Sequence, residues 1–231
     1  MKQRVLGLVA GAALFAMQAA SAQYIAGGGG SGPAAGDWEL RIGPQFIESK
    51  TIDFQGGASA KVDSSTGVKI GAGYYLTDGL VLGGNFSWSH ADFSATAASA
   101  TGSGTYEITG GHVDSTTFIF DARYKFLDGP FRPWVEAGLG GTWISTNIPN
   151  GYAQAGCWWD PWWGYICGTY QSTKGGSAFA GQLGAGFEVN FNRSYGLSAG
   201  YLWTEQSIDH ASGHPAFSGI EVMFNWRFTG Y

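Results

Sequence analysis

Three residues near the C-terminus have the types that nucleophilic acyl transfer uses: His210, Ser212 and Glu221. On a strand, residues i and i+2 share a face, so the His210 imidazole could activate the Ser212 hydroxyl. Glu221 follows on the next predicted strand. By the alternation of that strand its side chain points to the inner face, whereas a site on the outer surface would require the outer face. The simpler interpretation is a polar loop, and hydrolysis of an ester is the minor alternative.

The segment 157–167, CWWDPWWGYIC, contains both cysteines of the chain and five aromatic residues. Pro161 and Gly164 interrupt a strand ladder, and adjacent tryptophans cannot all point to one face, so the segment predicts a loop. In an exported chain two cysteines are expected to pair. A Cys157–Cys167 disulfide would hold the loop and contribute roughly 3 kcal/mol on the chain-entropy model.

The sequence evidence for a metal site or a phosphate-binding loop is weaker. His210 and His214, with Asp209 nearby, lack a convincing third ligand, so they predict solvated loop residues. The Gly71-x-Gly73 pair does not open a helix, as a phosphate-binding loop would. The sequence therefore predicts no catalytic residue, no metal site and no cofactor.

The first 22 residues indicate the compartment. Lys2 and Arg4 precede an apolar stretch over 5–17, and Ala20-Ser21-Ala22 provides small residues for cleavage. This is the pattern of a secretory signal peptide, and its apolar stretch is too short to span a membrane as a helix. We expect a signal peptide at 1–22, followed by a flexible Gly-rich tail at 23–36.

Composition narrows the class of protein. Cleavage would change the formal charge from −5 to about −7, and no basic run is present, which argues against a nucleic-acid partner. Glycine contributes 39 residues and aromatic residues 16%, whereas charged residues contribute only 13%. No apolar helical run of membrane-spanning length follows residue 22. A membrane location would therefore require a closed β-barrel, because open sheet edges cannot be satisfied in hydrocarbon.

From Asp37 onward the chain alternates between apolar and polar residues. In DWELRIGPQF, Trp38, Leu40 and Ile42 share one parity, while Glu39 and Arg41 share the other. The same alternation recurs seven more times, which predicts eight strands. Short connections fall at 77–79, 128–130 and 190–194, and long ones at 47–64, 93–112, 147–176 and 208–216. This alternation of short turns and long loops is typical of an outer-membrane barrel.

Charged residues test the choice of faces independently. Every charged residue within the predicted strands lies on the parity opposite the apolar face, and a lipid-facing Arg or Lys near the midplane would cost roughly 2 to 4 kcal/mol. We therefore predict a packed, ion-paired interior. The predicted network comprises Glu39, Arg41, Lys69, Asp121, Arg123, Lys125, Arg132, Glu136, Glu188, Glu221 and Arg227. Inward glycines on the same strands should make room for these long side chains.

The eight alternating strands, the signal peptide and the C-terminal segment EVMFNWRF resemble the small OmpA/OmpX/OmpW-like outer-membrane barrels, including the opacity-type surface proteins. The resemblance covers residues 37–231 and implies an all-β, eight-stranded antiparallel transmembrane barrel in the bacterial outer membrane. It also implies that Phe224, Trp226 and Phe228 form an insertion signal for the barrel assembly machinery. Such barrels include structural proteins, adhesins, narrow channels and a few enzymes, so fold alone does not choose among them.

The aromatic segment is the candidate surface contact of the barrel. Its members are Trp158, Trp159, Trp162, Trp163 and Tyr165. Their apolar area needs a partner, and three remain open: the barrel mouth, the lipid and sugar of the outer leaflet, or an external ligand of unknown identity.

We predict a monomeric, non-enzymatic surface barrel that contributes to envelope integrity or surface interaction, with outer-membrane lipid, including lipopolysaccharide, as a partner. One alternative is a narrow or gated channel for small solutes, hydrophobic ones included, which would need a gap in the interior network. The minor alternative is a lipid A acyl hydrolase. His210-Ala211-Ser212 is similar to the His-x-Ser-Asn motif of the PagL-type deacylases, except that Gly213 stands in place of Asn.

Overall fold

The computed structural model describes residues 33–55, 57–98, 105–150, 154–160, 162, 164–170, 172–208 and 211–229. The predicted signal peptide and most of the predicted tail lie outside these ranges. The regular structure that they contain is made of strands. None of the described residues belongs to a helix with the length and hydropathy that a membrane crossing would require.

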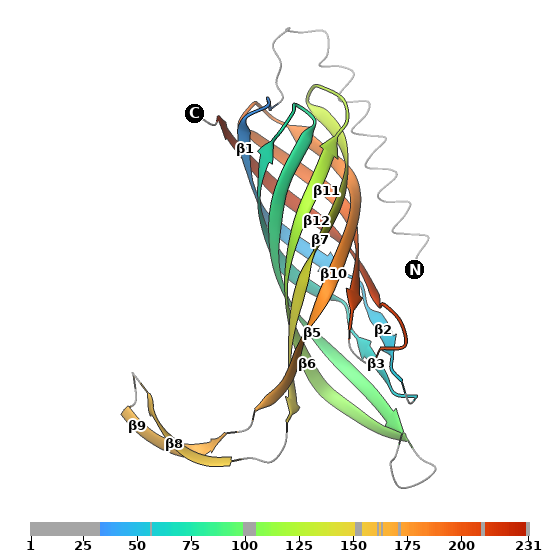
Figure 1. The fold of residues 1–231 in the computed structure, drawn as a ribbon, viewed down its shortest axis with the longest axis vertical. Helices are drawn as coiled ribbons and strands as arrows, with labels where there is room; N and C mark the ends of the chain where they lie inside the picture. The colour runs from blue at the N-terminus through green and yellow to red at the C-terminus, as the bar shows by residue number, and fades with distance from the viewer. Residues whose placement is uncertain are drawn as a thin grey trace.

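Eight strands of the described chain form a closed antiparallel barrel (Figure 1). They are β1 (Asp37–Ile47), β4 (Ser65–Tyr75), β5 (Leu80–Ala98), β6 (Thr105–Lys125), β7 (Phe131–Pro149), β10 (Thr173–Asn190), β11 (Tyr195–Ser207) and β12 (Ala216–Thr229). Neighbouring strands pair in this order, and β1 pairs with β12 at Trp38–Phe228, which closes the ring. The predicted eight-stranded barrel is confirmed, and its closure leaves no unpaired edge along the wall.

The two faces of the wall differ as the alternation predicts. The side chains of Phe120 and Tyr124 on β6, and of Phe126 just after it, point outward and are 67%, 48% and 42% exposed. Asp121 and Arg123, which alternate with them, are 4% and 1% exposed. Because the period of a strand is two, one register places Phe120 and Tyr124 outside and Asp121 and Arg123 inside.

The two ends of the barrel differ in their connections. The short turns 76–79, 126–130 and 191–194 lie at one end, together with the start of β1 and the end of β12 (Figure 1). We call this the turn end and the opposite one the hairpin end. Residues 34–36, assigned to the flexible tail from sequence, hydrogen-bond at the turn end: the Gly36 amide donates to the Tyr75 carbonyl, 2.9 Å away.

At the hairpin end the prediction of long loops was wrong in part. β5 and β6 run for 19 and 21 residues, so the predicted loop 93–112 is mostly strand. The predicted loop 47–64 contains β2 (Lys50–Asp53) and β3 (Ser59–Val62), which pair with each other, while β3 also pairs with β5. Antiparallel partners satisfy each other's backbone groups in water as well as in lipid, so the strands continue where the apolar alternation stops.

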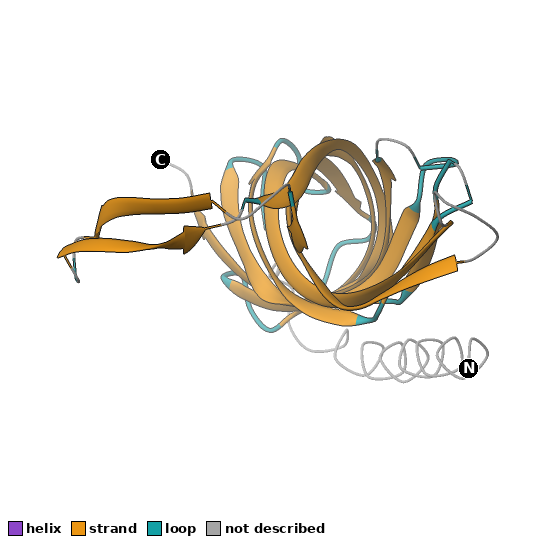
Figure 2. Cartoon of the chain, turned by 90° about the horizontal axis from the view of Figure 1, so that it is seen from below, coloured by secondary structure: helices purple, strands orange, loops and turns teal. Residues whose placement is uncertain are grey.

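The segment 157–167 is also not the loop that its sequence predicts. β8 (Gln154–Asp160) and β9 (Gly164–Tyr170) pair as a separate two-stranded ribbon. The sequence argument failed because the interruptions fall at the end of the ladder and not within it: β8 ends at Asp160, which pairs with Gly164, the first residue of β9, whose φ is +76°. Figures 1 and 2 show this ribbon reaching sideways from the hairpin end rather than covering the mouth.

Candidate functional site

All eleven charged residues of the predicted interior network lie inside the barrel. Each is at most 4% exposed, and they come from six of the eight wall strands, namely β1, β4, β6, β7, β10 and β12. They are Glu39, Arg41, Lys69, Asp121, Arg123, Lys125, Arg132, Glu136, Glu188, Glu221 and Arg227. Burying an unpaired charge is costly, so the partners of each determine whether the interior is stable.

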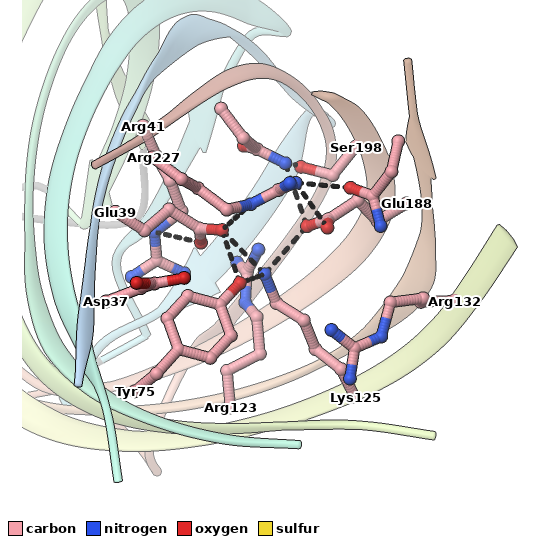
Figure 3. Close-up of polar contacts among 12 residues, drawn as sticks. Asp37, Glu39, Arg41, Tyr75, Arg123, Lys125, Arg132, Glu188, Ser198 and Arg227 are labelled. Atoms are coloured by element: carbon pink, nitrogen blue, oxygen red, sulfur yellow. Dashed lines mark hydrogen bonds and ion pairs between the residues drawn. The ribbon is translucent and has the colours of Figure 1, made fainter. Parts of the chain in front are cut away.

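The first cluster is built around Lys125, near the turn end (Figure 3). The Lys125 ammonium lies 2.8 Å from a Glu39 carboxylate oxygen and 2.7 Å from one of Glu188. Arg227 bridges the same two carboxylates, at 2.9 Å from Glu39 and 2.7 Å from Glu188. The Tyr75 hydroxyl donates to Glu39 at 2.6 Å and accepts from Lys125 at 2.5 Å. Two cations therefore neutralise two carboxylates in this cluster.

The second cluster is built around Arg123, which lies directly across from Glu136 in the β6–β7 ladder. Its guanidinium approaches a Glu136 oxygen at 2.6 Å and a Glu221 oxygen at 3.0 Å. Lys69 reaches the other Glu221 oxygen at 2.9 Å. Four charged residues thus connect strands β4, β6, β7 and β12 across the barrel.

Arg41 links the second cluster to the first. Its guanidinium lies 3.2 Å from Asp121, 3.5 Å from Glu136 and 3.9 Å from Glu39. Neutral amides also donate to two of these carboxylates: Asn85 donates to Asp121 at 2.6 Å, and Gln182 donates to Glu136 at 2.6 Å. The two clusters, together with Arg41 and Asp121, contain five cations and five carboxylates, and we refer to these ten residues as the interior network.

Arg132 is buried but lies outside the interior network, contrary to the sequence prediction. Its guanidinium donates to the Leu127 carbonyl at 2.9 Å and to the Asp78 carbonyl at 2.5 Å. Its nearest carboxylate is Asp128 at 4.0 Å, which is 97% exposed. Parity correctly places Arg132 inside, but its position next to the turns makes backbone carbonyls its partners. Without it, the charges of the interior network balance.

Trp134 is an interior residue that the sequence analysis missed. It is 1% exposed, and the Arg123 guanidinium carbon lies 4.0 Å from the centre of its ring, a cation–π contact. Gly186 and Gly200 make room for the indole; a Cβ at Gly186 would lie 2.6 Å from the ring. Trp134 is two residues from both Arg132 and Glu136 and therefore shares their inward face of β7, so the spacing in the sequence could have predicted that it points inward.

The ribbon carries the predicted disulfide and the candidate contact residues. Cys167 is disulfide-bonded, and Cys157 lies directly opposite it in the β8–β9 ladder. Trp159 pairs with Tyr165 in the same ladder, and the two are 71% and 69% exposed. Trp162, at the tip, is 89% exposed. The side chain of Trp158 and residue 163 lie outside the described part of the chain.

Of the hydrolytic candidates, the structure describes Ser212 and Glu221, and it does not bring these two together. Glu221 is buried in the interior network, where Lys69 and Arg123 occupy its carboxylate. The Ser212 amide donates to the Asp53 carbonyl at 2.7 Å, and His210 lies outside the described residues. Within the described ranges, no three or more His, Cys, Asp or Glu residues come close enough together to hold a metal ion.

The C-terminal strand presents the predicted aromatic signal on its outer face. Phe224, Trp226 and Phe228 are 42%, 47% and 42% exposed. They alternate with the buried Arg227 and lie opposite β1, where Leu40 pairs with Trp226. The final strand therefore both closes the ring and extends its apolar outer surface.

Comparisons with known proteins agree with this architecture. Residues 7–228 match the family model described as outer membrane protein beta-barrel domain. Among solved structures, the chain is similar to the outer membrane protein OprG from Pseudomonas aeruginosa, at 14% identity and a TM-score of 0.50, covering 87% of this chain and 100% of that chain. It is also similar to Neisserial surface protein A, at 15% identity and a TM-score of 0.49, covering 85% of this chain and 98% of that chain. Among curated proteins, none matches the chain.

Proposed function

Because the chain belongs to the outer membrane protein beta-barrel domain family, we propose that it works as a closed, non-enzymatic barrel that supports the envelope and presents contact surfaces outside the cell. The chain is a protein of the Gram-negative outer membrane. In such barrels the short turns face the periplasm and the long connections face outward. The turn end is accordingly periplasmic, and the hairpin end is extracellular.

The interior network is the single observation that carries this proposal. Its ten side chains are at most 4% exposed and bridge strands on opposite sides of the barrel. A narrow or gated channel would need a water-lined path through this cross-section. Opening such a path would separate buried charges from their partners, which is costly when it leaves either one unpaired. The network therefore supports a structural barrel over a channel.

The β8–β9 ribbon is the proposed contact surface. It reaches sideways at the extracellular end (Figure 2), which favours a partner beside the barrel over the barrel's own mouth. Tryptophan and tyrosine concentrate at membrane–water interfaces, where an apolar ring with a polar edge suits both environments. The exposed Trp159, Trp162 and Tyr165 are thus suited to the lipid and sugar of the outer leaflet, including lipopolysaccharide.

Assembly of the barrel is proposed to begin from its last strand. Phe224, Trp226 and Phe228 form an aromatic outer row on β12 that the barrel assembly machinery would recognise during insertion. Once β12 pairs with β1, each wall strand has both of its neighbours within one chain, so the barrel needs no second copy to close. We propose that it is a monomer.

A detergent-sensitivity experiment tests the envelope role. Gram-negative cells that lack the chain should be more sensitive to sodium dodecyl sulfate, and the native chain should restore their resistance. A Trp159→Ser, Trp162→Ser, Tyr165→Ser variant should restore less, because it removes the exposed aromatic area of the ribbon. The matched control replaces the same three residues with Phe and should restore resistance as the native chain does.

Surface abundance and folding are compared by the mobility of unheated samples on gels. Full protection by the Ser variant at equal abundance would rule out the ribbon as the protective contact. Lipid A from the same cells should keep its acyl chains. Loss of one chain that disappears with Ser212→Ala would instead reveal a hydrolase.

A further inference from the structure

The inward face of the barrel changes character halfway along its length. Toward the periplasmic end, β6 places Lys125, Arg123 and Asp121 inside. Farther out, the same inward parity continues with Thr117 and Val113, which line a cavity. On β5 the inward face carries no charge in either half, and in the outer half its inward side chains are serine, alanine and phenylalanine. The outer half of the interior therefore offers no fixed charge to a molecule inside it.

This cavity has a volume of about 340 Å³, within the range of small-molecule sites, roughly 300–1,000 Å³. Of the described residues that line it, none is Asp, Glu, Lys, Arg or His. Aliphatic and aromatic side chains such as Ile52, Phe93 and Ile144 alternate around it with hydroxyls such as Ser89 and Thr204. A charged ligand would lose its hydration there without gaining a counterion, which is costly.

A separate structural element walls the cavity. The β2–β3 ribbon contributes Ile52, Ala60 and Val62 to the lining, and Ile52 is only 7% exposed. The ribbon is fixed on both sides: β3 pairs with β5, and Phe54 forms a β-bridge with Ala211. The wall is thus held by backbone hydrogen bonds and does not rest on packing alone.

The floor of the cavity is joined to the interior network. Gln182 lines the cavity, is 6% exposed and donates to a Glu136 oxygen at 2.6 Å. The Thr204 hydroxyl lies 3.4 Å from the Gln182 side-chain oxygen, which completes this layer. Below Gln182 the charges fill the barrel, so the cavity ends there.

We propose that the outer half of the barrel is a blind binding pocket for a small, uncharged, mainly hydrocarbon molecule, walled by the β2–β3 ribbon and closed below by the interior network. The pocket takes its ligand from the extracellular side and retains it. Its hydroxyls suit a ligand with one neutral polar group. That the pocket is blind rests on the closed barrel proposed above, whereas its ligand class rests on its lining alone.

Methyl NMR of the chain in lipid nanodiscs tests this pocket with internal controls. The isoleucine methyls of Ile52 and Ile144 line the cavity, while Ile42 and Ile70 face outward and are 51% and 49% exposed. The probes are 1-naphthol, which is neutral, and 1-naphthalenesulfonate, which carries a charge on the same ring system. Naphthol should change the chemical shifts of the two pocket methyls, and the change should saturate as its concentration rises. The sulfonate should leave these shifts unchanged. The outward methyls should report only unsaturable partition into lipid.

Filling variants locate the binding. Ala91 lines the cavity at 7% exposure, and Ala91→Trp should weaken naphthol binding by about tenfold or more. Ser115→Leu is a milder filling variant, and Ala72→Trp adds the same side chain on the lipid face as a control. Three results would each overturn the proposal. The shifts of the pocket methyls could fail to saturate with naphthol concentration, the sulfonate could bind as well as naphthol, or both filling variants could bind naphthol as the native chain does. If naphthol binds saturably but the barrel conducts ions, the proposed ligand class stands. The blind pocket and the closed-barrel function are then both contradicted.

Discussion

Replacing Arg123 with alanine should destabilise the barrel by about 3–5 kcal/mol, because it leaves buried carboxylates without their counterion. Arg123 is 1% exposed and is the shared partner of Glu136 and Glu221. The change also removes the cation above the Trp134 ring. The free energy of unfolding is measured in denaturant on the barrel refolded into lipid vesicles.

A double-mutant cycle separates the charge imbalance from the lost packing. Adding Glu136→Gln to Arg123→Ala restores equal numbers of cations and carboxylates, and should recover part of the lost stability. Arg132→Ala is the matched control, since Arg132 is equally buried but bonds backbone carbonyls that water can reach near the turns. Simple additivity of the Arg123 and Glu136 changes would contradict a coupled network.

Replacing Ala122 with arginine should cost about 2–4 kcal/mol, because it places a cation in the hydrocarbon near the middle of the wall. Ala122 is exposed on the outer face of β6, halfway between Phe118 and Phe126. It lies opposite Ala137 of β7, where no carboxylate can pair with the new charge. Unfolding of the vesicle-embedded barrel provides the measurement.

Ala122→Leu is the control for this substitution, since it adds bulk without charge and should change stability little. Equal stability of the arginine and leucine variants would show that this position does not face the hydrocarbon. If only the arginine variant loses stability, the outward-facing side chains of β6 near Ala122 lie within the membrane.

The wall and its charged interior could be predicted from sequence because both follow from a period of two. Once Trp38 and Leu40 are placed outside, Glu39 and Arg41 must lie inside, and closure brings such residues together from distant strands. The partners of each charge could not be predicted, because they depend on stagger between strands. Arg132 shows the difference: its parity was correct, but its depth in the barrel gives it carbonyl partners.

The extracellular features were harder to predict for a physical reason. Outside the membrane both faces of a strand can be wet, so alternation no longer marks where strands run. That is why β8 and β9 were expected to be a loop, with Pro161 and Gly164 read as interruptions. The cavity was missed for a related reason: Ser89, Ala91 and Phe93 continue the inward parity without charges that would draw attention to it.

Single-channel recording in planar bilayers tests the central claim of a closed barrel most directly. The native chain should give no discrete currents, because the interior network fills the periplasmic half. A Lys125→Ala, Glu188→Ala variant removes a pair that is 2.7 Å apart and keeps the charges balanced, so it should conduct. Steady discrete openings of the native chain would contradict the closed barrel and make transport its function.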